Sequence, residues 1–263
     1  LVRSAEFLVE LLDGAPKVNL LVNSRQSLEL NSEWTFHLEG LAYHSLNENL
    51  FIEHSDAAKL FISRSQQANS RLLNFDGQQQ AAINLICKLV DGMPLGIEMA
   101  AAWSDLLQPS EIAQEIQKNL DFLTANKKDI PEKHTSMRII FNHTWQGLSD
   151  EDKLLYCRAA VFQGKFDLRA AVAILETSLS ELSRLIDRSL LRRNQSGYFS
   201  MHTLARQFGT EKLIQRKELF QDTSEKYYRY YVELMIQQQE ALLGADMIRA
   251  RDEIRPFLVN IQS

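Results

Sequence analysis

Residues 190–201 read Leu190-Leu-Arg-Arg-Asn-Gln-Ser-Gly-Tyr-Phe-Ser-Met201. In this segment two short apolar runs flank the polar turn Asn194-Gln-Ser-Gly197, a pattern that predicts a β-hairpin. Before the hairpin, apolar residues recur with helical spacing in the ranges 137–145, 149–161, 168–175 and 179–187. Helices followed by a hairpin, in this order, predict a winged-helix domain.

A different pattern occupies the first 45 residues. Helical spacing over residues 1–13 is followed by the apolar run Lys17-Val-Asn-Leu-Leu-Val-Asn23, whose β-branched valines predict a buried strand. The alternating segment Glu33-Trp-Thr-Phe-His-Leu38 predicts a further short strand. A helix, a turn and a buried strand in succession are typical of the trailing edge of an α/β sheet domain. The chain opens on Leu1 within an amphipathic pattern, so we expect it to be part of a longer polypeptide.

The rest of the chain is predicted to be helical, which makes the expected fold class mostly α. Helices over residues 46–125 are interrupted at Asp91-Gly-Met-Pro94, and the polar segment from Ala125 to Lys133 predicts a linker. After Thr203 the pattern is again helical to the end of the chain. Four clustered tyrosines there are expected to pack between helices: Tyr227, Tyr228, Tyr230 and Tyr231. The expected division is therefore 1–45, the end of an α/β domain; 46–125, a helical domain; 126–215, the winged helix; and 216–263, a linker or the first repeat helices.

Composition and charge exclude several classes of protein. The chain has 263 residues, of which 45% are hydrophobic and 24% charged, values that are average for a globular protein and oppose disorder. Its apolar runs fall short of the ~18 residues of a membrane span, so no membrane partner is expected. The net charge of −5 argues against a dedicated nucleic-acid binder. Cys87 and Cys157 lie in apolar runs, which predicts buried reduced thiols and a cytoplasmic location.

Motifs of the common enzyme classes are absent from the sequence. It contains no GxxxxGK(S/T) phosphate loop, and no HExxH, paired CxxC or GxSxG motif, so zinc and serine-hydrolase sites are not expected. The six histidines show no metal-ligand spacing. We therefore expect no metal site and no catalytic residue in this chain.

Three residues are candidates for contacting a phosphate or a base. Arg25 follows Leu20-Leu-Val-Asn-Ser at the carboxyl end of a predicted strand, where open α/β sheets bind ligands, and its planar guanidinium suits phosphate. Pro94 lies in a rigid turn between two helices and offers a flat apolar face to a purine. His202 lies beside a helix start, where phosphate oxygens can be received. The alternatives are a surface arginine, a simple helix break and a helix start capped by Thr203.

The predicted helix over residues 179–189 bears on DNA binding, because it occupies the place of a recognition helix. It carries two arginines, one glutamate and one aspartate, so it is nearly neutral. A helix that reads DNA is usually more basic. DNA binding through this part of the chain is therefore not expected.

In order and spacing, these features resemble the STAND class of signal-transduction ATPases, specifically the bacterial predicted-ATPase regulators that are similar to NB-ARC proteins. The resemblance covers about residues 1–215. The run ending at Arg25 is similar to the sensor-1 strand, and residues 28–41 to the segment that leads out of the nucleotide domain. Three further stretches match the GxP motif of the helical ARC domain, the opening of the winged helix and the MHD-type motif: 87–103, 136–149 and 198–208.

The resemblance implies a nucleotide-controlled switch. ADP would hold the nucleotide, ARC1-like and winged-helix domains together, and a signal at a C-terminal helical sensor would permit exchange for ATP. The chain would then open and self-associate, and an unknown effector would act. ADP or ATP, with Mg²⁺ in the full-length protein, is the implied cofactor, and an upstream P-loop segment the implied partner. By position, Arg25 would sense the γ-phosphate, Pro94 would lie against adenine and His202 would contact the β-phosphate of ADP. Thr203 replaces the aspartate of the MHD pattern.

Three hypotheses follow for the function. The leading one is the regulatory part of an ATP/ADP-gated signalling switch, a transcriptional or signalling regulator that is not catalytic as this chain, although the full-length protein would be a slow ATPase. The alternative is a winged-helix transcription regulator that binds DNA directly, with a steep salt dependence. The third is a structural helical adaptor, in which the motif residues have no ligand.

Overall fold

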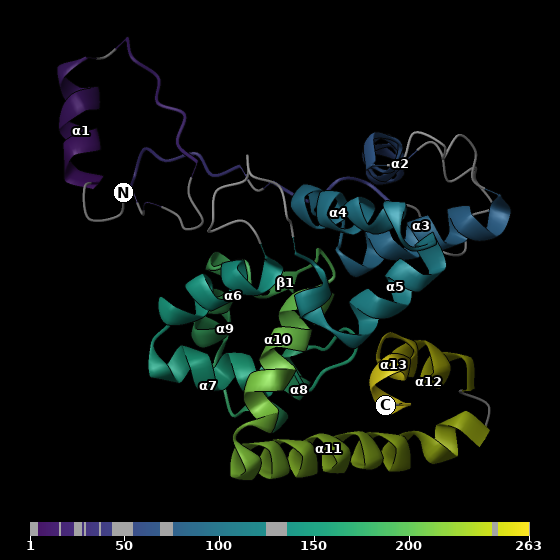
Figure 1. Cartoon of the computed structure of the whole chain (residues 1–263). Helices are drawn as coiled ribbons and strands as arrows, with labels where there is room; N and C mark the ends of the chain where they lie inside the picture. Colours follow the sequence, from purple (N-terminus) through teal and green to yellow (C-terminus); the bar gives the residue numbers. More distant parts are fainter. Residues whose placement is uncertain are drawn as a thin grey trace.

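The computed structural model describes residues 5–15, 17–23, 28, 30–36, 38–43, 55–68, 76–124, 136–243 and 247–262. Over these ranges the chain consists of helices and loops, with a two-stranded antiparallel sheet as its β structure (Figure 1). The expectation of a mostly α fold is confirmed. No helix in these ranges is both long and apolar enough to cross a membrane.

The first helix, α1 (Ala5–Gly14), stands apart from the other helices at the amino-terminal end of the chain (Figure 1). This helix was expected, but the strands predicted over 17–23 and 33–38 are wrong for the residues described there, which form no strand. Leu21 and Trp34 are almost fully exposed. A strand needs a hydrogen-bonding neighbour along its backbone, and no described segment provides one. The apolar run alone therefore does not form the trailing edge of a sheet.

Residues 55–124 form a helical unit with helices α2 (Asp56–Ala68), α3 (Gly77–Leu89), α4 (Pro94–Ala101) and α5 (Pro109–Lys118) and the 3₁₀ turns η3 (Ala102–Asp105) and η4 (Leu120–Phe122). A reciprocal capping box fixes the start of α3. The Gln79 amide donates to Oδ1 of Asp76 over 2.8 Å, and the Asp76 amide donates to the Gln79 side chain over 3.1 Å. α3 ends at Leu89 and α4 begins at Pro94, so the turn at residues 91–93 lies between them.

Residues 136–214 form a helix–hairpin unit, whose elements in order are α6 (Met137–Gln146), α7 (Asp150–Ala159), α8 (Leu168–Ala170), the π-helical turn η6 (Ala171–Leu175), α9 (Leu179–Asp187), β1 (Arg192–Arg193), β2 (Phe199–Ser200) and α10 (Thr203–Ile214). The predicted helices and hairpin are confirmed. In the hairpin, Arg192 pairs with Ser200 and Arg193 with Phe199. Gly197 has a φ of 84°, which a glycine adopts without strain, and so closes the turn.

The C-terminal unit consists of α11 (Lys217–Leu243), α12 (Met247–Ile254), the 3₁₀ turn η7 (Arg255–Phe257) and α13 (Leu258–Ile261). α12 and α13 fold back beside the long helix α11 (Figure 1). Tyr227 and Tyr231 on α11 are buried, whereas Tyr228 is exposed. The predicted packing of tyrosines between helices is therefore confirmed for Tyr227 and Tyr231, and Tyr230 is partly buried against the same core. The prediction is wrong for Tyr228, which is exposed.

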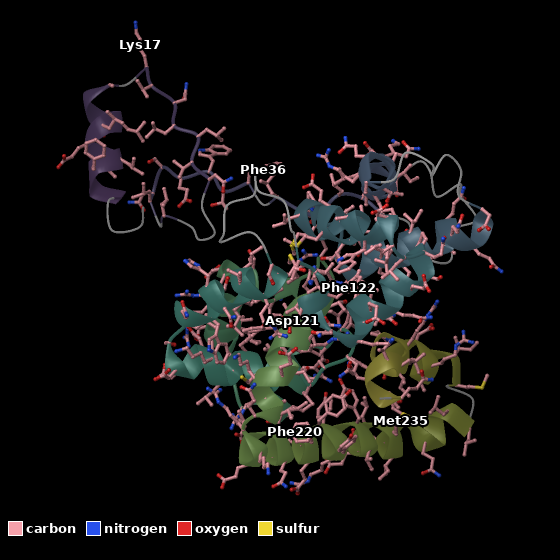
Figure 2. All side chains as sticks on the ribbon, viewed as in Figure 1. Lys17, Phe36, Asp121, Phe122, Phe220 and Met235 are labelled. Atoms are coloured by element: carbon pink, nitrogen blue, oxygen red, sulfur yellow. The ribbon has the colours of Figure 1, made fainter. Side chains whose placement is uncertain are left out.

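A continuous hydrophobic core joins the three units. Figure 2 places Asp121 and Phe122 where the helical unit meets the helix–hairpin unit. Phe122 stacks on Trp103 with ring centroids 4.7 Å apart. The largest fully buried aromatic side chains are Phe61, Tyr156, Phe162, Phe166, Phe199 and Phe208. This shared core fixes the three units relative to one another, and so places the hairpin and the start of α10 close to the turn between α3 and α4.

The two cysteines are buried free thiols, as predicted. Burial raises the pKa of Cys87 on α3 to about 12 and that of Cys157 on α7 to about 11. Both thiols are therefore protonated at neutral pH, and neither has the thiolate character of a reactive cysteine.

Candidate functional site

The candidate site is built on the turn that joins α3 to α4. Two successive residues of this turn have left-handed backbone conformations, Asp91 with φ 51° and Gly92 with φ 65°. The Gly92 amide donates to the carbonyl of Cys87 over 2.8 Å, and the Met93 amide donates to that of Val90 over 3.0 Å. Pro94 then opens α4, a position that needs no amide proton. The turn is thus held rigid by its own backbone, and the ring of Pro94 is exposed.

A segment 50 positions earlier lies directly against this turn. The Leu41 amide donates to the carbonyl of Gly92 over 2.8 Å, and the Tyr43 hydroxyl donates to Oδ1 of Asp91 over 2.7 Å. A Cβ atom at Gly40 would lie 2.1 Å from the carbonyl oxygen of Asp91, and one at Gly92 would lie 2.1 Å from that of Leu41. Both glycines are therefore required for two backbones to approach this closely.

The β-hairpin reaches the same turn from the other side. Arg192 on β1 forms an ion pair with Oδ2 of Asp91, so the two carboxylate oxygens of Asp91 contact two different parts of the chain, the 38–43 segment and the hairpin. Burial of the phenol, together with the Asp91 carboxylate beside it, raises the pKa of Tyr43 to about 12. Tyr43 consequently stays a hydrogen-bond donor over the whole physiological range.

His202 completes the site from the start of α10. Its Nδ1 accepts a hydrogen bond from the Leu204 amide over 2.9 Å, so His202 itself is the N-cap of α10. The alternative in which Thr203 caps this helix is wrong, because the imidazole already occupies the amide that a capping side chain would bind. With Nδ1 as acceptor, the proton of the neutral ring is on Nε2, which donates to the carbonyl oxygen of Val90 over 3.1 Å.

The charge state of His202 follows from its surroundings. Burial disfavours the imidazolium and lowers the pKa of His202, and the nearby guanidinium of Arg192 acts in the same direction. The carboxylate of Asp91 and the hydrogen bond to Val90 oppose this shift without cancelling it. His202 is therefore neutral at pH 7, which is the state that the hydrogen bond accepted by its Nδ1 requires.

Of the three residues predicted to contact a ligand, the structure brings two together. Pro94 and His202 are 108 positions apart, yet both adjoin the turn at residues 91–93. Arg25 lies outside the described residues. The sequence analysis missed Tyr43, Asp91 and Arg192. The Asp-Gly pair after an apolar helix was a signal for a left-handed turn, but nothing in the sequence indicated which segments contact it.

The arginines of α9 and β1 are engaged within the chain. Arg184 forms an ion pair with Asp152 at 2.9 Å, and Arg188 donates to the carbonyl of Gly147 over 3.0 Å. Arg192 is paired with Asp91, and the guanidinium of Arg193 lies 5.7 Å from the ring centroid of Phe199. The described part of the chain holds no cluster of three or more potential metal-ligating side chains.

Comparisons with known proteins find relatives that are similar to most of this chain. It is 27% identical over 241 residues to "Putative HTH-type transcriptional regulator Rv0890c" of Mycobacterium tuberculosis, with 88% of this chain and 26% of that protein covered. It is also 27% identical over 228 residues to "Uncharacterized protein Rv0894" of the same organism, with coverages of 81% and 54%. The chain thus spans about a quarter to a half of the curated relatives it matches. No protein-family model and no solved structure matches it.

Proposed function

We propose that this chain is the regulatory part of an ATP/ADP-gated signalling switch of the STAND class, similar to NB-ARC proteins. In this proposal the helical unit is the ARC1-like domain, the helix–hairpin unit is the winged-helix domain, and the two close over bound ADP. The observation that carries the proposal is the hydrogen bond from His202 to Val90. It joins the histidine of the MHD-type motif to the Gly-x-Pro turn, which are the two motifs that must meet for such a closure.

The residues at the turn fit a nucleotide in part. The exposed ring of Pro94 offers a flat apolar face, which suits a base. His202 has both ring nitrogens engaged by protein groups, so its Nε2 proton would have to leave the carbonyl of Val90 before it could be donated to a phosphate oxygen. When bound, ADP would supply that competing acceptor. The role of Arg25 toward a γ-phosphate stays a prediction from the resemblance.

The chain's own residues explain how closure would be held. Neutral His202 ties the start of α10 to the end of α3, and Asp91 ties both the 40–43 segment and the hairpin to the same turn. These contacts bring the 40–43 segment, the helical unit and the helix–hairpin unit together at residues 90–92. A change at the turn would therefore affect all three of these parts at once, which is the property that a switch needs.

Direct DNA binding through the helix–hairpin unit is the second candidate. The name of one relative, a putative HTH-type transcriptional regulator, favours it, although this chain spans only 26% of that protein. The engagement of Arg184, Arg188 and Arg192 with protein groups opposes it, because phosphate contacts would have to displace those partners. A gel shift with duplex DNA at increasing salt tests it, and steeply salt-dependent binding would support this candidate over the first.

The nucleotide content of the full-length protein tests the main proposal. The protein is purified without added nucleotide and denatured, and the released small molecules are separated by ion-exchange chromatography. Near-stoichiometric ADP is the expected result. A His202→Asn variant should release ADP faster, whereas His143→Ala, a change at an exposed histidine on α6, should not. Absence of bound nucleotide together with no binding of added ADP would overturn the proposal.

A further inference from the structure

The loop at residues 163–166, here called the docking loop, carries a contact between the C-terminal unit and the helix–hairpin unit. Asn260 on α13 is 1% exposed. Its Oδ1 accepts from the Gly164 amide over 2.7 Å, and its Nδ2 donates to the Lys165 carbonyl over 2.7 Å. The hydroxyl of Tyr227 on α11 donates to the backbone carbonyl of Asn260 over 2.7 Å. A buried amide side chain with this many short bonds fixes α13 on the docking loop in one orientation.

The docking loop is equally fixed to the two elements that flank His202. Phe166 exchanges both backbone hydrogen bonds with Phe199 on β2, at 3.0 and 2.7 Å, so the end of the loop forms an isolated antiparallel bridge beside the hairpin. Arg206 on α10 donates to the carbonyl oxygen of Gln163 over 2.7 Å and to its side chain over 2.8 Å. The loop thus holds the strand just before His202 and the helix just after it.

The side chains between α11, α13 and the docking loop are closely packed. Phe162 stacks on Phe166 with centroids 3.9 Å apart, and Tyr227 meets Phe162 edge-on at 5.9 Å. A Cβ atom at Gly164 would lie 3.0 Å from Cβ of Val259 on α13. Such tightly packed interiors transmit a displacement rather than absorb it. A shift of α13 would therefore reach β2 and α10 through the docking loop.

We propose that the C-terminal unit controls the His202 contact: α13, docked through Asn260, holds β2 and α10 where His202 reaches Val90, and undocking of α13 releases that contact. This inference adds a control element to the proposed switch and rests on that function for its biological meaning. Its test, however, measures the His202 contact itself and needs no nucleotide.

The first pair of variants introduces a steric clash between the docking loop and α13, and then removes that clash. Gly164→Ala should push against Val259 and loosen the docking. Gly164→Ala combined with Val259→Gly removes the opposing Cβ atom together with its methyl groups and should restore it. Asn260→Ala removes both side-chain bonds to the loop, and Gln262→Ala, at an exposed position after α13, is the matched control.

Two readouts report on His202 in the full chain. Hydrogen exchange at the imidazole carbon, followed by mass spectrometry against pH, gives the pKa of His202, with exposed His143 as the internal reference. Amide exchange of the first turn of α10 reports the Leu204 bond to Nδ1. In Gly164→Ala and Asn260→Ala, the pKa of His202 should rise toward its ordinary 6.5, and amide exchange there should quicken about tenfold. The double variant and Gln262→Ala should match the unmodified chain.

The contrary outcome is equally definite. If amide exchange of α13 shows that it has undocked while the pKa of His202 and exchange at α10 stay unchanged, the proposal is overturned and α13 is only a structural anchor. If Asn260→Ala unfolds the chain, judged by circular dichroism, the milder Gly164→Ala pair decides the question. Absence of bound ADP in the full-length protein would overturn the proposed switch but leave this coupling standing, so the two failures are distinguishable.

Discussion

The hydroxyl of Tyr43 donates to Oδ1 of Asp91 over 2.7 Å, across 48 positions of sequence. This bond shows why the turn after α3 is more than a helix break. Asp91 takes a left-handed backbone conformation, uncommon for a residue with a side chain, and so directs one carboxylate oxygen to the incoming segment and the other to Arg192 on the hairpin.

The close approach of residues 40–41 to the turn depends on two glycines. Gly92→Ala should lower the free energy of unfolding by at least about 2 kcal/mol, because it adds both a strained φ and a contact with the Leu41 carbonyl. Gly40→Ala should instead detach the 38–43 segment and speed proteolysis there. Gly77→Ala, at a site with open space around it, is the control for both. Native-like proteolysis of Gly40→Ala would contradict the geometry.

Removing the whole side chain of Asp91 should lower the free energy of unfolding more than removing its charge alone. Asp91→Asn keeps an acceptor for Tyr43 and a side chain that tolerates the left-handed region, and loses only an ion pair on the half-exposed Arg192, a loss of roughly 0–1 kcal/mol. Asp91→Ala loses both contacts and is strained, so it should cost roughly 2 kcal/mol. Urea unfolding measures both. Equal effects of the two changes would show that the Tyr43 bond contributes nothing.

Two substitutions separate the two hydrogen bonds of His202. Asn is a good N-cap but too short to reach Val90, so His202→Asn should lose only the bond between units, about 1 kcal/mol. His202→Ala should lose the cap as well, for a total of about 2 kcal/mol. Chemical denaturation of both variants tests this order. If the two variants are equally stable, His202 does not cap α10.

The lowered pKa of His202 gives stability a defined pH dependence. The unfolded chain binds a proton with the ordinary pKa of 6.5, whereas the folded chain resists it. The contribution is therefore complete above pH 6.5 and is lost as the pH falls below that value, with a slope of at most about 1.4 kcal/mol per pH unit. Below the folded-state pKa the slope from this group vanishes. The difference between the unmodified chain and His202→Asn isolates it, and a difference that does not vary with pH would refute the assignment.

Both cysteine thiols, Cys87 and Cys157, should be unreactive toward thiol reagents in the folded chain. Because burial raises the pKa of Cys87 to about 12 and that of Cys157 to about 11, a thiol reagent at neutral pH should react only with molecules that have unfolded. Reaction rates should rise in step with urea unfolding measured by circular dichroism. Cys87→Ser and Cys157→Ser assign the signal to each site. Rapid reaction of either thiol under native conditions would contradict its burial.

Local signals in the sequence were sufficient for most of the secondary structure. The range of α9 was predicted to the residue, and the hairpin was predicted from the polar turn at 194–197. Both depend on residues close in sequence: a capping box at Ser178 and Glu181 begins α9, and Gly197 supplies the left-handed turn residue. The strand over 17–23 failed for the converse reason, because a strand is stabilised by a distant neighbour that no local pattern guarantees.

What the sequence by itself determined is where helices begin and end and which face of each is apolar, because capping, turn chemistry and periodicity act within a few residues. It also singled out Pro94 and His202. Only the tertiary structure decided that these two adjoin one turn, that Tyr43 and Arg192 share the carboxylate of Asp91, and that the imidazole caps α10 while donating to Val90. These contacts span 48 to 112 positions and depend on how whole units pack. The hydrophobic effect that drives this packing is non-directional, so an apolar face in the sequence does not indicate which other face it will contact.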